Sequence, residues 1–121
     1  MQKGLIVIAA MFGMLFSTAV INPVLATPAT PRRVEVTAKK FSFEPAEITV
    51  QKGQAVDLVV KSADVAHGLR IRELNLDVKV NKGATADAHF TADKTGTFVG
   101  HCSVFCGSGH GKMTLTIHVV E

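Results

Sequence analysis

Hydrophobic and polar residues alternate along most of the chain after residue 33. Short segments rich in Val, Ile, Thr and Phe are separated by Gly, Asn, Asp and Lys at nearly regular intervals. No apolar period typical of a helix is sustained over three turns, so the pattern indicates strands rather than amphipathic helices. It predicts about eight strands: Val34–Phe43, Glu47–Val50, Ala55–Ser62, His67–Ile71, Asp77–Val80, Thr85–Thr91, Gly96–His101 and Met113–Val120.

The segments between these strands contain residues typical of turns. Three of these segments are Gln51–Gln54, Asn81–Gly83 and Asp93–Gly96. Each contains a glycine, which adopts a positive φ at little cost. In the last strand, Leu115, Ile117 and Val119 are expected to face inward and His118 outward. Short strands with one apolar face each bury those faces against a second sheet, so the expected fold is an all-β sandwich.

Residues 1–26 have the features of a targeting segment. Lys3 precedes an apolar run that ends near Ile21, and the small residues Val24 and Ala26 fit a cleavage site after residue 26. The run is also about as long as the shortest membrane span, so a cleaved signal peptide and a retained anchor helix both remain open. In either case residues 27–32 form a Pro-rich tether, and residues 33–121 form a domain on the extracytoplasmic side, such as the bacterial periplasm.

Length and charge limit the possible functions. With 121 residues and a net charge of +3, the chain has room for one ordinary domain, and its basic residues are scattered rather than clustered. It contains seven Phe but no Trp or Tyr, so an aromatic platform for stacking bases is not expected. These features argue against nucleic-acid binding.

The segment from His101 to Met113 holds both cysteines, two of the five histidines and the only methionine after residue 26. Within it, Cys102, Cys106, His110 and Met113 follow one another at short intervals. Thiolate, imidazole and thioether donors together favour copper over harder metals. A single loop lacks a second imidazole, and His67, at the start of a predicted strand, can lie at the same end of a sandwich and supply it.

Other interpretations of these residues remain open. A disulfide between Cys102 and Cys106 in a secreted structural domain would leave His110 and Met113 without a role. A zinc site would have no need of the thioether. A mononuclear blue copper site could use His67 together with Cys106, His110 and Met113, and only a binuclear site gives Cys102 an obvious function. A copper-delivery or storage protein serving an oxidase is a further alternative.

At these residues the sequence closely resembles the cupredoxin domain of cytochrome c oxidase subunit II. The segment from Cys102 to Met113 matches the copper A motif C-x-x-x-C-G-x-x-H-x-x-M, and Val65–Gly68 matches the surroundings of the family's first histidine ligand. The resemblance extends over about residues 33–121 and includes the opening segment from Lys40 to Gly53. It implies a cupredoxin-like Greek-key β-sandwich.

The resemblance also implies a ligand set and a role. Cys102 and Cys106 would bridge two copper ions, His67 and His110 would each bind one, and Met113 and the backbone carbonyl of Val104 would be weak axial donors. A site filled in this way leaves no position for a substrate, so it implies a one-electron carrier rather than an enzyme. Its expected partner is a redox protein such as a c-type cytochrome or a terminal oxidase, and the chain could be an accessory or subunit of a cytochrome c oxidase-type complex.

Two differences from the family concern partners rather than metal. Subunit II has two membrane helices before this domain, whereas here there is at most one, which is closer to small free-standing periplasmic cupredoxins. The family's aromatic docking patch for cytochrome c is centred on Trp, which this chain lacks. Phe105 is expected either near the sulfurs or in the core. No metal-binding role is assigned to the remaining histidines, His89, His101 and His118.

Overall fold

The structure is a computed structural model that describes residues 4, 13, 17–23 and 30–121. Most of the predicted signal or anchor segment (1–26) and the first half of the tether (27–29 of 27–32) therefore lie outside the described residues. Among those that are described, no helix has the length and apolar character needed to cross a membrane.

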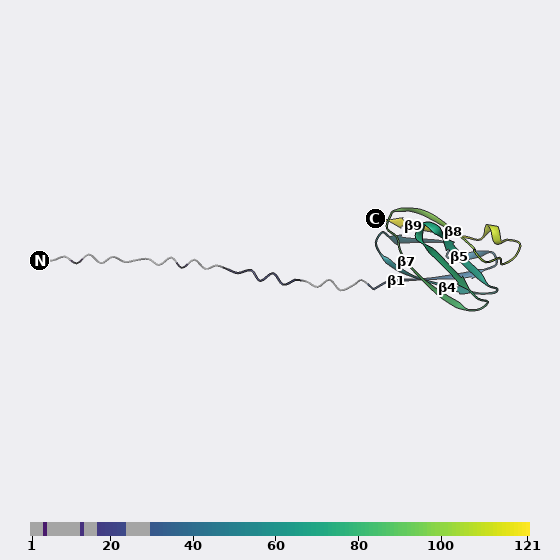
Figure 1. The fold of residues 1–121 in the computed structure, drawn as a ribbon, viewed down its shortest axis with the longest axis horizontal. Helices are drawn as coiled ribbons and strands as arrows, with labels where there is room; N and C mark the ends of the chain where they lie inside the picture. Colours follow the sequence, from purple (N-terminus) through teal and green to yellow (C-terminus); the bar gives the residue numbers. More distant parts are fainter. Residues whose placement is uncertain (1–3, 5–12, 14–16, 24–29) are drawn as a thin grey trace.

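Nine strands and two short 3-10 helices make up the described part of the domain (Figure 1). In chain order they are β1 (Arg32–Lys39), β2 (Ser42–Glu44), β3 (Glu47–Gln51), β4 (Ala55–Ser62), β5 (His67–Ile71), η1 (Arg72–Leu74), β6 (Leu76–Val80), β7 (Thr85–Thr91), β8 (Gly96–His101), η2 (His110–Lys112) and β9 (Thr114–Val120). They form two sheets with the strand orders β2-β1-β4-β7 and β3-β9-β8-β5-β6. The predicted all-β sandwich is confirmed.

The core lies between the inward faces of the two sheets. Strand β9 alternates as predicted, because Leu115, Ile117 and Val119 are buried while His118 is not. The opposing sheet contributes residues such as Leu58 and Val60 from β4, which are fully buried. Each fully buried Leu, Ile or Val side chain contributes about 1.5–3 kcal/mol through removal of apolar surface from water. This burial holds the two sheets together and fixes the ends of their strands.

The first predicted strand, Val34–Phe43, is wrong in one respect, because the chain reverses within it. Strand β1 ends at Lys39, the chain turns at Lys40 and Phe41, and β2 pairs antiparallel with β1 in the register Lys39↔Ser42. The turn is held from the neighbouring β4–β5 loop, where the Asp64 carboxylate accepts a hydrogen bond from the Lys40 backbone N–H at 2.7 Å. The apolar positions change phase at Lys39 and Lys40, but a change of phase alone does not distinguish a β-bulge from a reversal of the chain.

Four loops meet at one end of the sandwich, and we call this the ligand end. They are the β1–β2 turn (40–41), the β4–β5 loop (63–66), the β6–β7 turn (81–84) and the β8–β9 loop (102–113). Backbone hydrogen bonds join several of them: Ala63 N–H donates to the Ala38 carbonyl, and Ser62 N–H donates to the Ala84 carbonyl. In Figure 1 the yellow-green β8–β9 loop lies at the end of the domain away from the C-terminus.

Candidate metal centre

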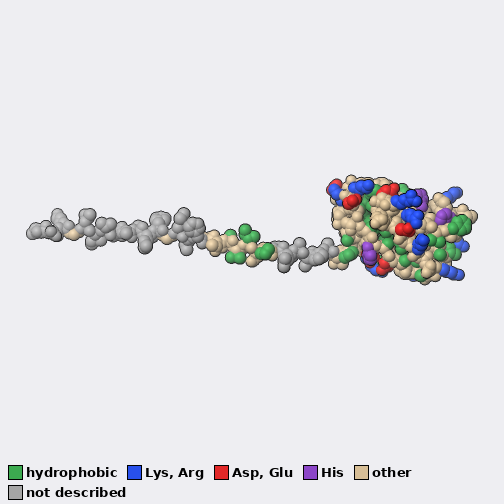
Figure 2. Space-filling model, viewed as in Figure 1, with side chains coloured by type: hydrophobic (Ala, Val, Ile, Leu, Met, Phe, Trp, Pro, Cys, Tyr) green, Lys and Arg blue, Asp and Glu red, His purple; other side chains and the backbone are tan. Residues whose placement is uncertain are grey.

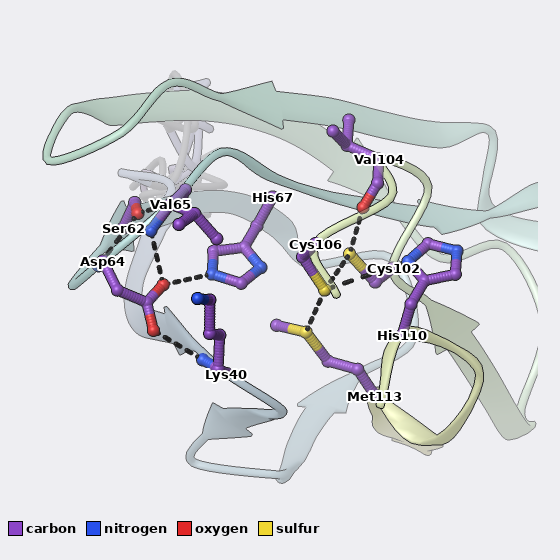
Figure 3. A network of polar contacts seen from close by, with 10 residues as sticks. All are labelled: Lys40, Ser62, Asp64, Val65, His67, Cys102, Val104, Cys106, His110 and Met113. Atoms are coloured by element: carbon purple, nitrogen blue, oxygen red, sulfur yellow. Dashed lines mark hydrogen bonds and ion pairs between the residues drawn. The ribbon is translucent and has the colours of Figure 1, made fainter. Parts of the chain in front are cut away.

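A buried cluster of potential metal ligands lies at the ligand end. A ring nitrogen of His67 and the sulfurs of Cys102 and Cys106 all lie within 4.8 Å of one another. His67 is fully buried, and the two cysteines are only 5% and 6% exposed. His67 comes from the start of β5, whereas both cysteines come from the β8–β9 loop (Figure 3). The fold therefore brings together the two segments that sequence analysis paired.

The two cysteines are free, and their sulfurs are 3.8 Å apart. A disulfide requires a sulfur separation near 2.05 Å, so the two side chains are not covalently joined. Three further donor atoms lie around this sulfur pair. The Val104 carbonyl oxygen is 3.1 Å from Cys102 Sγ, Met113 Sδ is 3.8 Å from Cys106 Sγ, and His110 Nδ1 is 3.9 Å from Cys106 Sγ. All six predicted site residues thus lie in one cluster.

His67 is oriented by Asp64. Its Nε2 lies 2.6 Å from Asp64 Oδ1, and Figure 3 shows the other ring nitrogen pointing toward the cysteine sulfurs. That second nitrogen, Nδ1, is buried and has no hydrogen-bond partner among the described residues. A carboxylate that accepts the Nε2 proton leaves a lone pair on Nδ1, which is the form of imidazole that binds a metal.

The Asp64 carboxylate is stabilised in its charged form. Burial alone would raise its pKa, but hydrogen bonds from Lys40 N–H, the His67 ring and Val65 N–H outweigh that effect and lower its pKa to about 2. The short β4–β5 loop holds the carboxylate in place, because Asp64 N–H donates to Ser62 Oγ, which in turn donates to the Val65 carbonyl. Asp64 is therefore ionised at every pH at which the protein would function.

Replacement of Asp64 by Asn is expected to weaken copper binding by about 10- to 100-fold. The amide has no charge with which to hold the Nε2 proton, so His67 loses both its fixed tautomer and its orientation. A competition titration with a Cu(I) chelator measures the change. Asp87→Asn on the exposed face of β7 is a matched control that removes the same charge far from the cluster, and an Asp64→Asn variant with unchanged affinity would contradict this role.

The β8–β9 loop is anchored on both sides of the cluster. Ser103 N–H donates to the Gly68 carbonyl of β5, and Cys102 N–H donates to the Met113 carbonyl at the start of β9. The Phe41 ring covers the loop from outside: a Cβ added at Gly107 would lie 2.9 Å from this ring. Real Cβ atoms do not approach so closely. The loop can therefore follow this path only because glycine lies under Phe41.

The buried Cys106 thiol is protonated in the metal-free protein. Burial raises the pKa of Cys106 to about 11, and the neighbouring Cys102 adds to the increase through its hydrogen bond and charge. Metal binding requires thiolates, so each thiol must release its proton when the metal enters.

Copper uptake is therefore expected to be pH-dependent. The apparent affinity for copper should rise by about tenfold per pH unit for each thiol proton released, at pH values well below the raised pKa of Cys106. In the metal-free protein the folded state holds the Cys106 proton more tightly than the unfolded chain does. The free energy of unfolding should thus decrease as pH rises from 9.0 to about 11. Chelator competition at several pH values and denaturant unfolding measure the two effects; affinity that does not change with pH would contradict the assignment.

The donor set fits copper. Two thiolates, two imidazoles and a thioether are soft or borderline donors, and the carbonyl is a weak hard one. His67 Nδ1, which has no hydrogen-bond partner in the described part of the chain, is a donor free for a metal at the same place. The other histidines lie elsewhere: His101 is exposed on the outer face of β8, and the side chains of His89 and His118 are 74% and 37% exposed. Sequence analysis missed Asp64, although its position three residues before His67 was visible, and it did not anticipate Phe41 as the cover of the loop.

The class of protein follows from comparison with known families. A family model for a cupredoxin-like domain matches residues 4–115, so the chain belongs to the cupredoxin-like family. Within it the chain is homologous to cytochrome c oxidase subunit 2: it is 32% identical over 98 residues to that subunit from Thermus thermophilus. The match covers 81% of this chain and 73% of the relative, but only 58% of a second, longer form of the subunit from the same species.

Solved structures show the same fold. The periplasmic domain of subunit II of cytochrome oxidase (CoxB) of Bradyrhizobium japonicum superimposes with a TM-score of 0.70 at 23% identity, over 78% of this chain and 87% of that one. Auracyanin from Roseiflexus castenholzii superimposes with a TM-score of 0.61 at 18% identity, over 77% of this chain and all of that one. At these identities the two likenesses establish the shared sandwich.

Proposed function

We propose that the chain is a copper-binding electron carrier with a binuclear copper A-type site. The ligands would be the thiolates of Cys102 and Cys106, the imidazoles of His67 and His110, the thioether of Met113 and the carbonyl of Val104. The observation that carries the proposal is the buried cluster in which His67 Nδ1, without a hydrogen-bond partner among the described residues, faces two free thiols.

Cys102 favours two ions over one. A mononuclear blue copper site needs one thiolate, two imidazoles and a thioether, which Cys106 and its neighbours supply without Cys102. The Cys102 sulfur nevertheless lies inside the cluster, 3.8 Å from the Cys106 sulfur. Two neighbouring sulfurs, with the other donors around them, are what two metal ions that share both thiolates would require.

The surrounding residues would keep the site rigid and dry. Bound copper would supply a centre that gains and loses one electron. The β8–β9 loop that carries most of the ligands is held by two hydrogen bonds, to the carbonyl of Gly68 in β5 and to that of Met113 immediately before β9. Met113 is fully buried, which excludes water from one side of the cluster. Ligands that move little between oxidation states allow fast electron transfer, and the buried surroundings of the sulfurs influence the reduction potential.

The relatives support a proposal for the location and partners of this chain. The CoxB structure is of a periplasmic domain, and the Thermus relative is an oxidase subunit. For this chain we propose an extracytoplasmic domain of residues 33–121, delivered by residues 1–26 as a signal peptide or single-helix anchor, with residues 27–32 as a tether. Its partner would be a c-type cytochrome or a terminal oxidase, and it would act as a free carrier or as a component of an oxidase-type complex.

Voltammetry together with chelator resistance tests the carrier function. The copper-loaded protein is expected to cycle reversibly by one electron at an electrode and to keep its copper in an excess of a strong Cu(I) chelator. A copper-delivery protein would instead give up its metal readily to the chelator. Rapid loss of copper combined with no reversible wave would rule out the proposed carrier.

A further inference from the structure

Phe105 is exposed although it lies between two buried copper-ligand candidates. Its side chain is 78% exposed, whereas Cys106, which follows it, is buried. The expectation that Phe105 lies near the sulfurs or in the core is wrong. Of the large hydrophobic side chains found exposed in the described residues, it is the only aromatic one. An exposed aromatic ring next to a functional centre is a common feature of protein interaction surfaces.

The Phe105 ring leads directly to the cluster. Its centroid lies 5.6 Å from that of the His110 ring, at an interplanar angle of 47°. His110 Nδ1 is in turn 3.9 Å from Cys106 Sγ. The path from the protein surface to a sulfur of the cluster therefore passes through two neighbouring aromatic rings.

Lysines outnumber carboxylates at the ligand end, to which Phe105 belongs. The four loops of the ligand end carry three exposed lysines, Lys40, Lys82 and Lys112, and a single carboxylate, Asp64, whose oxygens already accept hydrogen bonds from Lys40 N–H, Val65 N–H and His67. Lys112 belongs to the same loop as Phe105. Lys40 precedes Phe41, whose ring lies against Gly107 and Gly109 of that loop. Figure 2 shows hydrophobic side chains at this end of the molecule bordered by Lys and Arg.

The excess of positive charge is local. At the opposite end, the β3–β4 and β7–β8 turns and the end of the chain carry Lys52 and Lys94 against Asp93 and Glu121. On the outer face of β5 and β6, Arg70 donates two hydrogen bonds to Asp77. The turns at the opposite end are balanced, and the outer face of β5 and β6 carries Arg70 and Lys79 against Asp77, so the ligand end has the largest excess of positive charge of these three regions.

We propose that Phe105 is the central contact of a docking surface for an acidic redox protein, whose cofactor lies under an apolar patch rimmed by carboxylates. The proposal rests on the proposed function and adds the chemistry of the partner. An apolar centre excludes water at the contact, while the lysine rim attracts and orients the carboxylates. One electron passes between the partner's cofactor and the copper through Phe105 and His110; no bond is made or broken and no proton moves.

The test compares two c-type cytochromes with the full-length, copper-loaded protein in a stopped-flow experiment. One cytochrome has carboxylates around its haem edge and the other has lysines. The acidic cytochrome is expected to react at least tenfold faster at low salt, and its rate should fall as ionic strength rises. Equal rates, or a faster basic cytochrome, would overturn the proposal.

Variants test the lysines and the Phe105 ring of this surface separately. Lys40→Gln with Lys112→Gln should lower the rate with the acidic cytochrome by about tenfold, whereas the matched pair Lys52→Gln with Lys94→Gln should leave it unchanged. Phe105→Ser should also lower the rate by about tenfold, because aromatic anchors dominate such contacts, and Phe105→Leu should restore most of it. Equal effects of the two lysine pairs, or a Phe105→Ser variant as fast as the native protein, would overturn the proposal.

Amide chemical-shift mapping gives a readout that does not depend on electron transfer. Addition of the acidic cytochrome should shift the amides of residues 103–112 and of the β1–β2 turn, and shifts confined to the opposite end would overturn the proposal. If the copper cycles at an electrode but these amides do not shift, only the docking inference fails. If the amides shift but the copper does not cycle, the proposed function fails and the docking surface stands.

Discussion

Replacement of Cys102 by Ser is expected to leave at most one copper ion per chain, whereas the proposed native site would hold two. The hydroxyl is nearly the same size as the thiol but is a poor ligand for copper, so the second bridging donor is lost. The remaining donors are those of a mononuclear blue copper site: His67, Cys106, His110 and Met113. The variant should therefore show the absorption spectrum of such a site. The loss is large because both ions of the proposed site share the Cys102 sulfur.

Copper and protein assays on the purified variant, with a visible absorption spectrum, measure this effect. Ser108→Ala in the same exposed loop is a suitable control and should bind copper like the native protein. Circular dichroism shows whether the sheets remain intact. A Cys102→Ser variant that keeps both the copper content and the spectrum of the native protein would mean that Cys102 is not a ligand.

Replacement of Gly109 by Ala is expected to disrupt the ligand loop. The added Cβ would lie 2.5 Å from Phe41 Cδ2 and 2.9 Å from Phe41 Cβ, so either the ring or the loop must move. The base of a Phe side chain cannot rotate out of the way, because Phe41 is held in a tight turn between β1 and β2. We expect a loss of about 1–3 kcal/mol in the free energy of unfolding, and weaker copper binding because His110 follows directly.

Gly111 provides a matched control for this prediction. It lies two residues further along, and a Cβ added there meets nothing within 4 Å. Gly111→Ala should therefore leave both stability and copper affinity close to native values. The double variant Phe41→Ala with Gly109→Ala should recover part of the affinity lost in Gly109→Ala alone, since the two shortest contacts, with Phe41 Cγ and Cδ2, are removed and only the 2.9 Å contact with the Cβ of residue 41 remains. Similar effects of Gly109→Ala and Gly111→Ala would show that Phe41 does not constrain the loop.

Strand positions could be predicted because they depend on local alternation. The inward faces of β4 and β9 follow a period of two, and the turns between strands contain glycines at positive φ, such as Gly53 and Gly83. The reversal at Lys40 and Phe41 could not be predicted in this way. It depends on the Asp64 carboxylate, which is 24 residues further along the chain. Tertiary contacts of this kind leave no periodic signal in the sequence.

The ligand set could be proposed because its residue types are chemically distinctive and four of them lie close together in the sequence. His67 was included because the loop lacked a second imidazole, and the structure places it within reach of both sulfurs. Asp64 could not be ranked above other acidic residues without knowing that the His67 ring turns toward it. The predicted position of Phe105 was wrong because strand alternation does not apply in a loop. Both cysteine side chains are turned inward, and the residue before Cys106 is turned outward.

The most direct test of the binuclear site is copper stoichiometry combined with electron paramagnetic resonance of the oxidised, full-length protein. We predict two copper ions per chain and a single unpaired electron whose hyperfine splitting comes equally from both nuclei, because the two thiolates would share that electron between the ions. One copper ion per chain, with hyperfine splitting from a single nucleus and a blue colour, would contradict it.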